Sequence, residues 1–293
     1  MNCVWIQLSE QCVEVPQSNR SWLYVPGDRH DRFGKAIASG ADAVIFDLED
    51  SVLPSQREIA IRRVDDFLGT YVGDVRLWVR VNDAINRHPD VAALARHGSL
   101  DGFVIPKFEA PEHCAGWGKP TLGLIETPKG VVECAKITAA AAVHLHGIAL
   151  GPEDLSVNLG VAPTLDSLNH AAASIVMAGH AAKRYAYACP GSIGEFRDLN
   201  AWRLTLEAGR RLGGHGSMCI HPAQVAVANE VFTPSGIEVD WATRVLAVWE
   251  SGGGQGALEM DGKMIDLPVV QRARNVLART PGNIARPARQ RQS

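Results

Sequence analysis

The sequence has 293 residues, a formal net charge of −3, 46% hydrophobic residues and 21% charged residues. This composition is typical of a globular protein with a sizeable core, and it argues against a nucleic-acid or membrane partner. Six cysteines without a C-x-x-C pair exclude a zinc framework and a dense disulfide scaffold. We therefore expect reduced thiols and a cytoplasmic location.

Short apolar runs recur along the chain and predict eight strands. They are Ser21–Val25, Ala43–Leu48, Arg76–Val81, Gly102–Pro106, Thr121–Ile125, Gly147–Leu150, Tyr185–Cys189 and Ser217–Ile220. Helical patterns lie between them, at Asp31–Ser39, Gln56–Leu68, Val91–His97, Pro128–Ala139, Asp166–Lys183, Leu199–Leu212 and Pro222–Val231. Strands without polar alternation, each followed by a helix, predict a parallel sheet that is covered on both faces. Eight of them favour an α/β fold of the (β/α)8 TIM-barrel type, and an open doubly wound sheet is the structural alternative.

A C-terminal extension follows the barrel pattern. It contains a helical stretch at Asp240–Trp249, a glycine-rich connector over residues 251–256, and an Asp261-Gly262 pair that predicts a hairpin turn. Pro268 then opens a last helix. We expect a barrel domain over residues 20–235, an extension of hairpin plus helix over residues 236–280, and a disordered tail over residues 281–293.

Charged side chains gather where the predicted strands end, which is the edge at which active sites form in parallel α/β folds. They are Asp47, Glu49 and Asp50 after the second strand, Arg80 on the third, Lys107 after the fourth, Glu126 after the fifth, and Glu153 and Asp154 after the sixth. Such charges are costly unless they are paired or bound. Both signs on several strands therefore indicate a metal ion and an anionic substrate.

Glu126 and Asp154 are the candidate metal ligands. Carboxylates from neighbouring strand ends suit Mg²⁺, which takes one or two protein carboxylates and completes its octahedron with water and substrate. The structural alternative is that one of these acids pairs with Lys107 or Arg80.

The remaining strand-end residues receive supporting assignments. Arg80 can hold a carboxylate or a developing enolate oxygen with its planar fork, or form a salt bridge to the Asp47 group, or both. The acids Asp47, Glu49 and Asp50, together with Lys107, are expected behind the metal ligands, as partners of metal-bound water or of basic side chains. Backbone N–H groups around Gly151, Pro152, Glu153 and Asp154 are candidates for binding the substrate carboxylate.

The histidines offer a weaker signal. His144 and His146 precede the sixth strand and so lie at the wrong end of a barrel for chemistry, which favours a structural or surface role. His221 follows the eighth strand, where capping and orientation are as plausible as catalysis.

Several segments in order resemble the citrate lyase β-subunit family, whose relatives include malyl-CoA and citramalyl-CoA lyases. They are Arg20–Gly27, Ala41–Ser51, Val79–Asn82, Ile105–Lys107, Leu124–Thr127, Gly151–Leu155, Cys219–Pro222 and Asp261–Asp266. The resemblance implies a TIM-type barrel in a trimer or a dimer of trimers, with Mg²⁺ held by Glu126 and Asp154 and substrate contacted by Arg80. It also implies that Asp266 enters the active site of a neighbouring subunit as the acid/base. The segment Cys189–Arg197 departs from the usual run of the family, at a place where it could change which acyl group fits.

These observations predict a Mg²⁺-dependent carbon–carbon lyase that cleaves a 3-hydroxyacyl-CoA to a 2-keto acid and acetyl-CoA. Citramalyl-CoA, malyl-CoA and citryl-CoA are the candidate substrates, with CoA as part of the substrate. Three alternatives stay open: an aldolase acting on free pyruvate- or oxaloacetate-type acids, the β subunit of a multi-protein citrate lyase acting on an acyl-carrier thioester, and a non-catalytic acyl-CoA-binding protein.

Overall fold

The computed structural model describes residues 18–82 and 88–280. These residues form two compact units that divide between Phe232 and Thr233. The tail expected over residues 281–293 lies outside the described residues.

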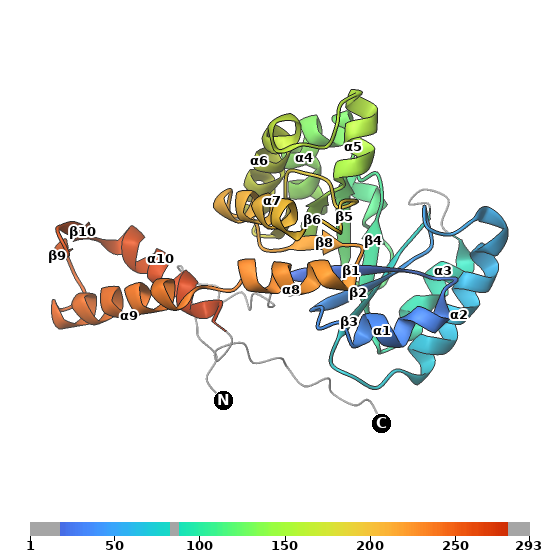
Figure 1. Cartoon of the computed structure of the whole chain (residues 1–293), viewed down its shortest axis with the longest axis horizontal. Helices are drawn as coiled ribbons and strands as arrows, with labels where there is room; N and C mark the ends of the chain where they lie inside the picture. Colours follow the sequence, from blue (N-terminus) through green and yellow to red (C-terminus); the bar gives the residue numbers. More distant parts are fainter. Residues whose placement is uncertain (1–17, 83–87, 281–293) are drawn as a thin grey trace. The chain divides into compact units, whose positions relative to one another are not determined.

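In the described part of the first unit, eight parallel strands alternate with helices (Figure 1). The strands are β1 (Ser21–Pro26), β2 (Ala43–Asp47), β3 (Arg76–Arg80), β4 (Leu100–Ile105), β5 (Thr121–Ile125), β6 (Leu145–Leu150), β7 (Tyr185–Tyr187) and β8 (Ser217–Cys219). Their order, β7-β6-β5-β4-β3-β2-β1-β8, follows the chain and returns β8 to β1. Between β7 and β8, the N–H of His215 donates to the carbonyl of Ala186 at 2.9 Å. The (β/α)8 barrel is confirmed, and the open doubly wound alternative is wrong because its strand order would reverse at a switch point.

The helices of this unit are α1 (Phe33–Ile37), α2 (Arg57–Thr70), α3 (Pro89–Ala93), α4 (Pro128–Ala141), α5 (Pro152–Leu159), α6 (Leu165–Ala181), α7 (Leu199–Arg211) and α8 (Pro222–Val231). Polar residues directly before several helices fix their first turns: Thr127, Asp198 and His221 each accept a hydrogen bond from a backbone N–H of the helix that follows. The sequence prediction missed α5. This helix occupies the segment that follows β6, so the candidate donors at Gly151–Asp154 are its N-cap and first turn.

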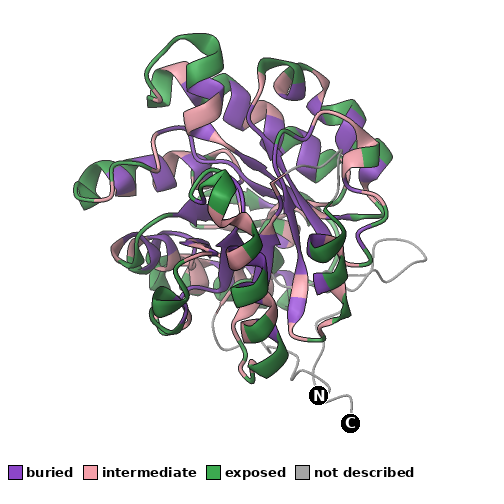
Figure 2. Cartoon of the chain, turned by 90° about the vertical axis from the view of Figure 1, so that its right-hand side faces the viewer, coloured by how far each residue is buried: buried purple, intermediate pink, exposed green. Residues whose placement is uncertain are grey.

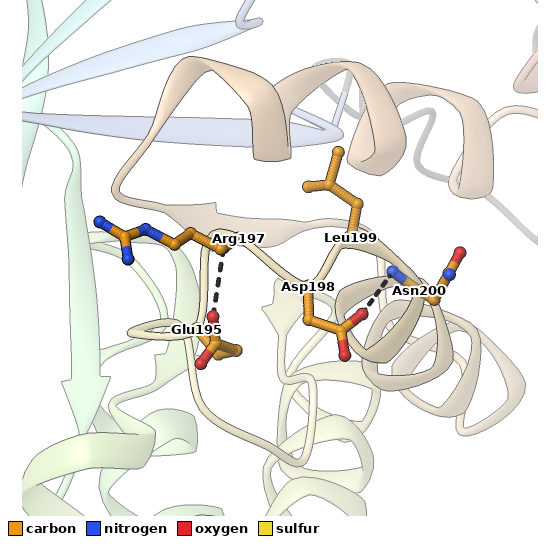
Figure 3. A pocket seen from close by; sticks show the side chains of 5 residues that line it. All are labelled: Glu195, Arg197, Asp198, Leu199 and Asn200. Atoms are coloured by element: carbon orange, nitrogen blue, oxygen red, sulfur yellow. Dashed lines mark hydrogen bonds between the residues drawn. The ribbon is translucent and has the colours of Figure 1, made fainter.

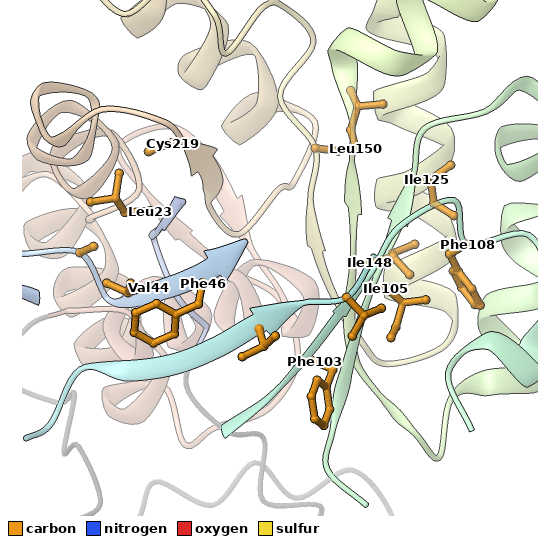
Figure 4. Close-up of a cluster of buried hydrophobic side chains, with 14 of the residues drawn as sticks. Leu23, Val44, Phe46, Phe103, Ile105, Phe108, Ile125, Ile148, Leu150 and Cys219 are labelled. Carbon is orange, nitrogen blue, oxygen red and sulfur yellow. The ribbon is translucent and has the colours of Figure 1, made fainter. Parts of the chain in front are cut away.

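Strand residues alternate between two hydrophobic clusters, as the period of two requires. One set, which includes Val44, Phe46 and Phe103, packs between the strands and the surrounding helices (Figure 4). The other set, which includes Ile45 and Trp78, fills the barrel interior. Figure 2 shows the strands buried, while the helices keep exposed outer faces. Full burial of each large apolar side chain contributes roughly 1.5–3 kcal/mol, so this double layer holds the strand ends in fixed positions.

The second unit contains α9 (Gly236–Ser251), β9 (Leu258–Met260), β10 (Lys263–Ile265) and α10 (Leu267–Ala278). It has its own apolar cluster, in which Val245 and Val270 are fully buried. The two strands pair antiparallel across Asp261 and Gly262, which have φ values of 55° and 72°. Two adjacent residues with positive φ are what a type I′ turn requires, so the predicted hairpin is confirmed.

Candidate active site

The inward-facing positions of the strands continue into charged residues at the carboxyl end of the barrel. On β2, Ala43 and Ile45 belong to the interior cluster and Asp47 is the next residue of the same parity. Arg80 follows Trp78 on β3 in the same way, and these two ends are in register, Asp47 opposite Arg80. Glu126 follows Leu124 after β5. The alternation that buries the apolar residues therefore also turns these charges toward the mouth of the barrel.

Arg80 and Asp47 form the best-ordered pair at this mouth. Nε and Nη2 of Arg80 donate to the two carboxylate oxygens of Asp47 at 2.6 and 2.8 Å, in the fork geometry that suits a carboxylate. Burial opposes ionisation of Asp47, but the hydrogen bonds and charge of Arg80 outweigh it and hold the pKa of Asp47 below its ordinary value. Nη1 of Arg80 lies 2.9 Å from Glu49 and 3.3 Å from Asp50. The predicted contact between Arg80 and the Asp47 group is present.

Lys107 connects two of the acids through different atoms. Its backbone N–H donates to Oε1 of Glu126 at 2.7 Å, and its ammonium donates to Oε1 of Glu49 at 2.9 Å. Lys107 has a φ of 48°, which is uncommon for a residue with a side chain and turns its N–H toward Glu126. The backbone of Lys107, rather than its charge, therefore positions Glu126.

Glu126 carries the least compensated charge of the mouth. The residue is 2% exposed, and burial, together with the nearby charges of Glu49 and Asp154, raises the pKa of Glu126 to about 8, although the Lys107 N–H opposes this. Gly151 packs closely against it, because a Cβ at Gly151 would lie 2.5 Å from Oε2 of Glu126. Glycine at this position is therefore required for the carboxylate to stay where it is.

This electrostatic arrangement fits a divalent cation. Among the described residues, neither Glu126 nor Asp154 forms an ion pair with a lysine or an arginine, so the alternative of a structural salt bridge finds no support there. No group of three or more His, Cys, Asp or Glu side chains encloses a metal within residues 18–82 and 88–280. A site with two protein carboxylates and open positions for water and substrate is typical of Mg²⁺.

Glu153 is turned toward a neighbouring loop rather than toward Glu126. Its Oε1 accepts hydrogen bonds from the hydroxyl of Ser192 at 2.6 Å and from the N–H groups of Ile193 and Gly194 at 3.0 and 3.1 Å. This carboxylate therefore ties the loop after β7 to the first turn of α5. No side chain caps α5, so its first-turn N–H groups stay candidates for an anion.

Two residues of this region were not singled out from the sequence. The ring of Tyr24 lies under the guanidinium of Arg80, with Cζ 5.0 Å from the ring centroid. Gln224 is fully buried and uses both ends of its amide to join the loops after β7 and β8. For Tyr24 the available signal was its position two residues after Trp22 in the same strand, because alternate strand residues face the same side. For Gln224 the available signal was its position three residues after the N-cap His221, where its side chain accepts from the N–H of His221 as in a capping box. The contact with Ile193 could not be foreseen, because Ile193 lies on another loop.

The predicted histidine roles are borne out in part. The ring of His221 accepts a hydrogen bond from Ala223 N–H at 3.1 Å, which is a capping role. The prediction that His146 precedes the sixth strand is wrong, because β6 begins at Leu145. The expected structural role of His146 is seen in a contact with the Tyr187 hydroxyl at 3.0 Å, among the aromatic rings at the amino end of the barrel interior. Burial lowers the pKa of His146 to about 3, so its ring is neutral there.

Asp266 belongs to the second unit. It is the N-cap of α10, and its Oδ1 accepts a hydrogen bond from Val269 N–H at 3.3 Å. The structure places it at the end of the hairpin, and its catalytic role stays a prediction.

A hollow of about 580 Å³ lies along the loop that leads into α7 (Figure 3). It is lined by Glu195, Arg197, Asp198, Leu199 and Asn200. Figure 3 shows the hydrogen bonds within this loop, from Arg197 N–H to Glu195 and from Asn200 N–H to Asp198. The lining includes none of the acids at the strand ends, so we assign the chemistry to those acids and not to the hollow.

The barrel and its acid-rich mouth agree with a comparison against protein families. The model of the HpcH/HpaI aldolase/citrate lyase family matches residues 20–116 and 120–222, and the chain belongs to this family. The chain is 34% identical to a (3S)-malyl-CoA thioesterase of Cereibacter sphaeroides over 271 residues, covering 89% of this chain and 94% of that protein. It is 32% identical to an L-malyl-CoA/beta-methylmalyl-CoA lyase of the same species over 298 residues, covering 87% and 92%.

The fold is also similar to a solved structure. The crystal structure of CitE from Mycobacterium tuberculosis in complex with magnesium, acetoacetate and coenzyme A matches with a TM-score of 0.75 and 30% identity, covering 89% of this chain and 98% of that one. The resemblance drawn from the sequence motifs is therefore confirmed. Within the described residues, no helix is long and apolar enough to cross a membrane.

Proposed function

We propose that this protein is a Mg²⁺-dependent lyase that splits a 3-hydroxyacyl-CoA into a 2-keto acid and acetyl-CoA. The observation that carries the proposal is Glu126, whose pKa is raised by burial and by the charges of Glu49 and Asp154, and which forms no ion pair with a basic side chain among the described residues. A divalent cation would offset the charge of Glu126. Family membership and the likeness to a malyl-CoA/beta-methylmalyl-CoA lyase support the reaction class.

In this proposal Glu126 and Asp154 hold the cation. A bound Mg²⁺ would withdraw electron density from the hydroxyl and carboxylate of the substrate. At the start of α5, the substrate carboxylate would be received by the N–H groups of Glu153 and Asp154 and by the positive dipole end of the helix. Pro152 has no N–H, and the N–H of Gly151 donates to the carbonyl of Ile125 at 3.0 Å. Asp47 orients Arg80, and Glu49, Asp50 and Lys107 balance the remaining charge around it.

The bond that breaks joins C2, next to the thioester, to the hydroxyl-bearing C3. The hydroxyl would pass its proton to water or to one of the acids Asp47, Glu49 and Asp50. C3 then becomes the keto carbon, and the electron pair of the bond moves onto C2 and the thioester oxygen. Arg80 would stabilise that oxygen. Asp266 would then protonate C2, or remove its proton in the condensation direction.

We further propose that Asp266 acts on the active site of another subunit, in a homotrimer or hexamer. Among the described residues, Asp266 lies on a compact unit that begins at Thr233. An element that acts on a neighbouring subunit would need to be such a separate unit. The proposal places the activity in the cytoplasm. It is supported by the cysteines of the described residues, Cys114, Cys134, Cys189 and Cys219, which are all buried free thiols.

The test is product analysis with the purified chain. With Mg²⁺ present, malyl-, citramalyl- and citryl-CoA are each supplied, and glyoxylate, pyruvate or oxaloacetate is measured together with acetyl-CoA. We expect one keto acid and one acetyl-CoA for each thioester consumed, and loss of turnover with EDTA. Turnover that continues in EDTA would contradict the metal-dependent lyase. Activity on the free acids, or only on acyl-carrier thioesters, would support the aldolase or the multi-subunit alternative instead.

Thioester hydrolysis is a second candidate function, because the chain is 34% identical to a (3S)-malyl-CoA thioesterase. The same assay separates the two reactions. Hydrolysis releases free CoA thiol and the intact hydroxy acid, without a keto acid.

A further inference from the structure

The mouth of the barrel has two chemically different sides. The charged side chains come from the ends of β2 to β5 and from α5, as described above. On the side of β7, β8 and β1 the side chains near the interior cluster are uncharged: Ile193 in the loop after β7, Ile220 directly after β8, and Tyr24 in β1. Ile193 and Tyr24 pack against the interior cluster of the barrel, and Ile220 follows Met218 at the same parity.

Ile220 is 41% exposed, although it follows a strand whose residues are all buried. Ile193 packs against both the interior cluster and the outer cluster, so it lies at the rim where the two layers meet. Apolar side chains that stay accessible beside a polar site are typical of a ligand pocket.

Hydrogen bonds with Gln224 hold the backbone at both isoleucines, and Glu153 adds a second contact at Ile193. Oε1 of Gln224 accepts from Ile220 N–H at 2.8 Å, and Nε2 of Gln224 donates to the carbonyl of Ile193 at 2.9 Å. Glu153 accepts from the N–H of Ile193. Since Glu153 precedes the proposed ligand Asp154 in α5, the same hydrogen bonds that hold Ile193 also connect it to the proposed metal site.

We propose that Ile193 and Ile220 form an apolar wall that determines which substituent the substrate carries at C3. This inference rests on the proposed lyase function and deepens it. The three candidate thioesters differ at C3 by a hydrogen, a methyl group or a charged carboxymethyl group. An apolar wall favours the methyl group over hydrogen by its contacts, and it disfavours the carboxymethyl group because a carboxylate would lose its water without a partner. The wall therefore selects the methyl-substituted substrate, citramalyl-CoA, with pyruvate as the keto product.

The test compares kcat/KM for citramalyl-CoA and malyl-CoA in the wild type and in Ile193→Ala, Ile193→Val and Ile220→Ala. We expect the wild type to favour citramalyl-CoA, and each alanine variant to lower that preference about tenfold, which is the usual effect of one methyl contact. Ile193→Val should shift the preference in the same direction by a smaller factor, and it serves if Ile193→Ala does not fold. Leu204→Ala, at an exposed apolar residue of α7 (56% exposed), is the matched control and should leave the ratio unchanged.

A ratio that stays within twofold of the wild type in all three isoleucine variants would overturn the apolar wall while leaving the lyase in place, and so would a wild type that prefers citryl-CoA. Failure of the lyase proposal gives a different result, because the wild type would then form no keto acid from any thioester. In that case the proposed role of the apolar wall in substrate selection would also be wrong.

Discussion

Arg80 is held between acids on three sides, and its side chain is only 12% exposed. Replacement by methionine would keep much of its volume but leave Asp47 buried without its partner. We expect Arg80→Met to lower the free energy of unfolding by about 3–5 kcal/mol, the usual cost of an uncompensated buried charge. Urea denaturation measures this change.

Lys129→Met is the control for that experiment, because Lys129 pairs with Glu109 at 3.1 Å but is 66% exposed. An exposed pair of this kind contributes less than about 1 kcal/mol. Equal losses in the two variants would contradict the account of Arg80 as a buried, paired charge.

Glu126 gives a pH dependence with a definite sign. Its pKa is raised in the folded protein from 4.5 to about 8, so the folded state binds the proton more tightly than the unfolded state does. Between these two values the metal-free protein should lose stability as the pH rises, by up to about 1.4 kcal/mol per pH unit, and the loss should end above the folded pKa.

Glu126→Gln removes the titratable carboxyl. The unfolding free energies of the wild type and the variant are measured in EDTA from pH 5 to 9, and their difference isolates the contribution of Glu126. The unfolding free energy of the wild type should fall relative to that of the variant as the pH rises to about 8. A difference that is constant with pH would mean that the carboxyl is not perturbed by burial.

At the scale of elements, the loop after β7 depends on Gln224. Replacement by leucine fills a similar volume but removes the hydrogen bonds to Ile193 and Ile220, and it leaves their backbone groups without this partner. We expect Gln224→Leu to destabilise the protein by about 2–3 kcal/mol and to speed amide hydrogen exchange at Ile220. Exchange that stays as slow as in the wild type would show that Gln224 does not hold these loops.

The sequence predicts elements well where their signals are local. Continuous apolar runs located every strand of the barrel, and the Asp261-Gly262 pair located the hairpin. Helix α5 was missed, although Pro152 at its first turn and Gly160 in a left-handed conformation after its end are ordinary helix boundaries. The helix is only eight residues long, too short for a clear periodicity.

Side-chain contacts between distant segments could not be predicted. Charges at the strand ends indicated the location of the site, because all parallel strands end at the same edge of the barrel. The partners of each charge depend on register and loop path. Glu153 illustrates this, because its contacts with Ser192 and Ile193 join residues about 40 positions apart.

At the scale of the whole molecule, the proposal that Asp266 serves a neighbouring subunit can be tested by mixing. Glu126→Gln and Asp266→Asn should each be nearly inactive alone. If subunits exchange and Asp266 acts between them, an equal mixture regains activity, up to about a quarter of the wild type from random pairing. Product formation is the measurement, with each variant alone as the control. A tagged copy shows whether subunits have exchanged. If they have exchanged and the mixture still has no activity, Asp266 acts on its own barrel or takes no part in the reaction.

The central claim is that Glu126, directly after β5, and Asp154, in the first turn of α5, hold a divalent ion. Titration calorimetry with Mg²⁺ tests it directly, on the wild type, Glu126→Gln and Asp154→Asn. The account predicts one ion per chain in the wild type, with affinity reduced at least about tenfold in each variant. Magnesium binding that is equally tight in all three proteins would contradict it.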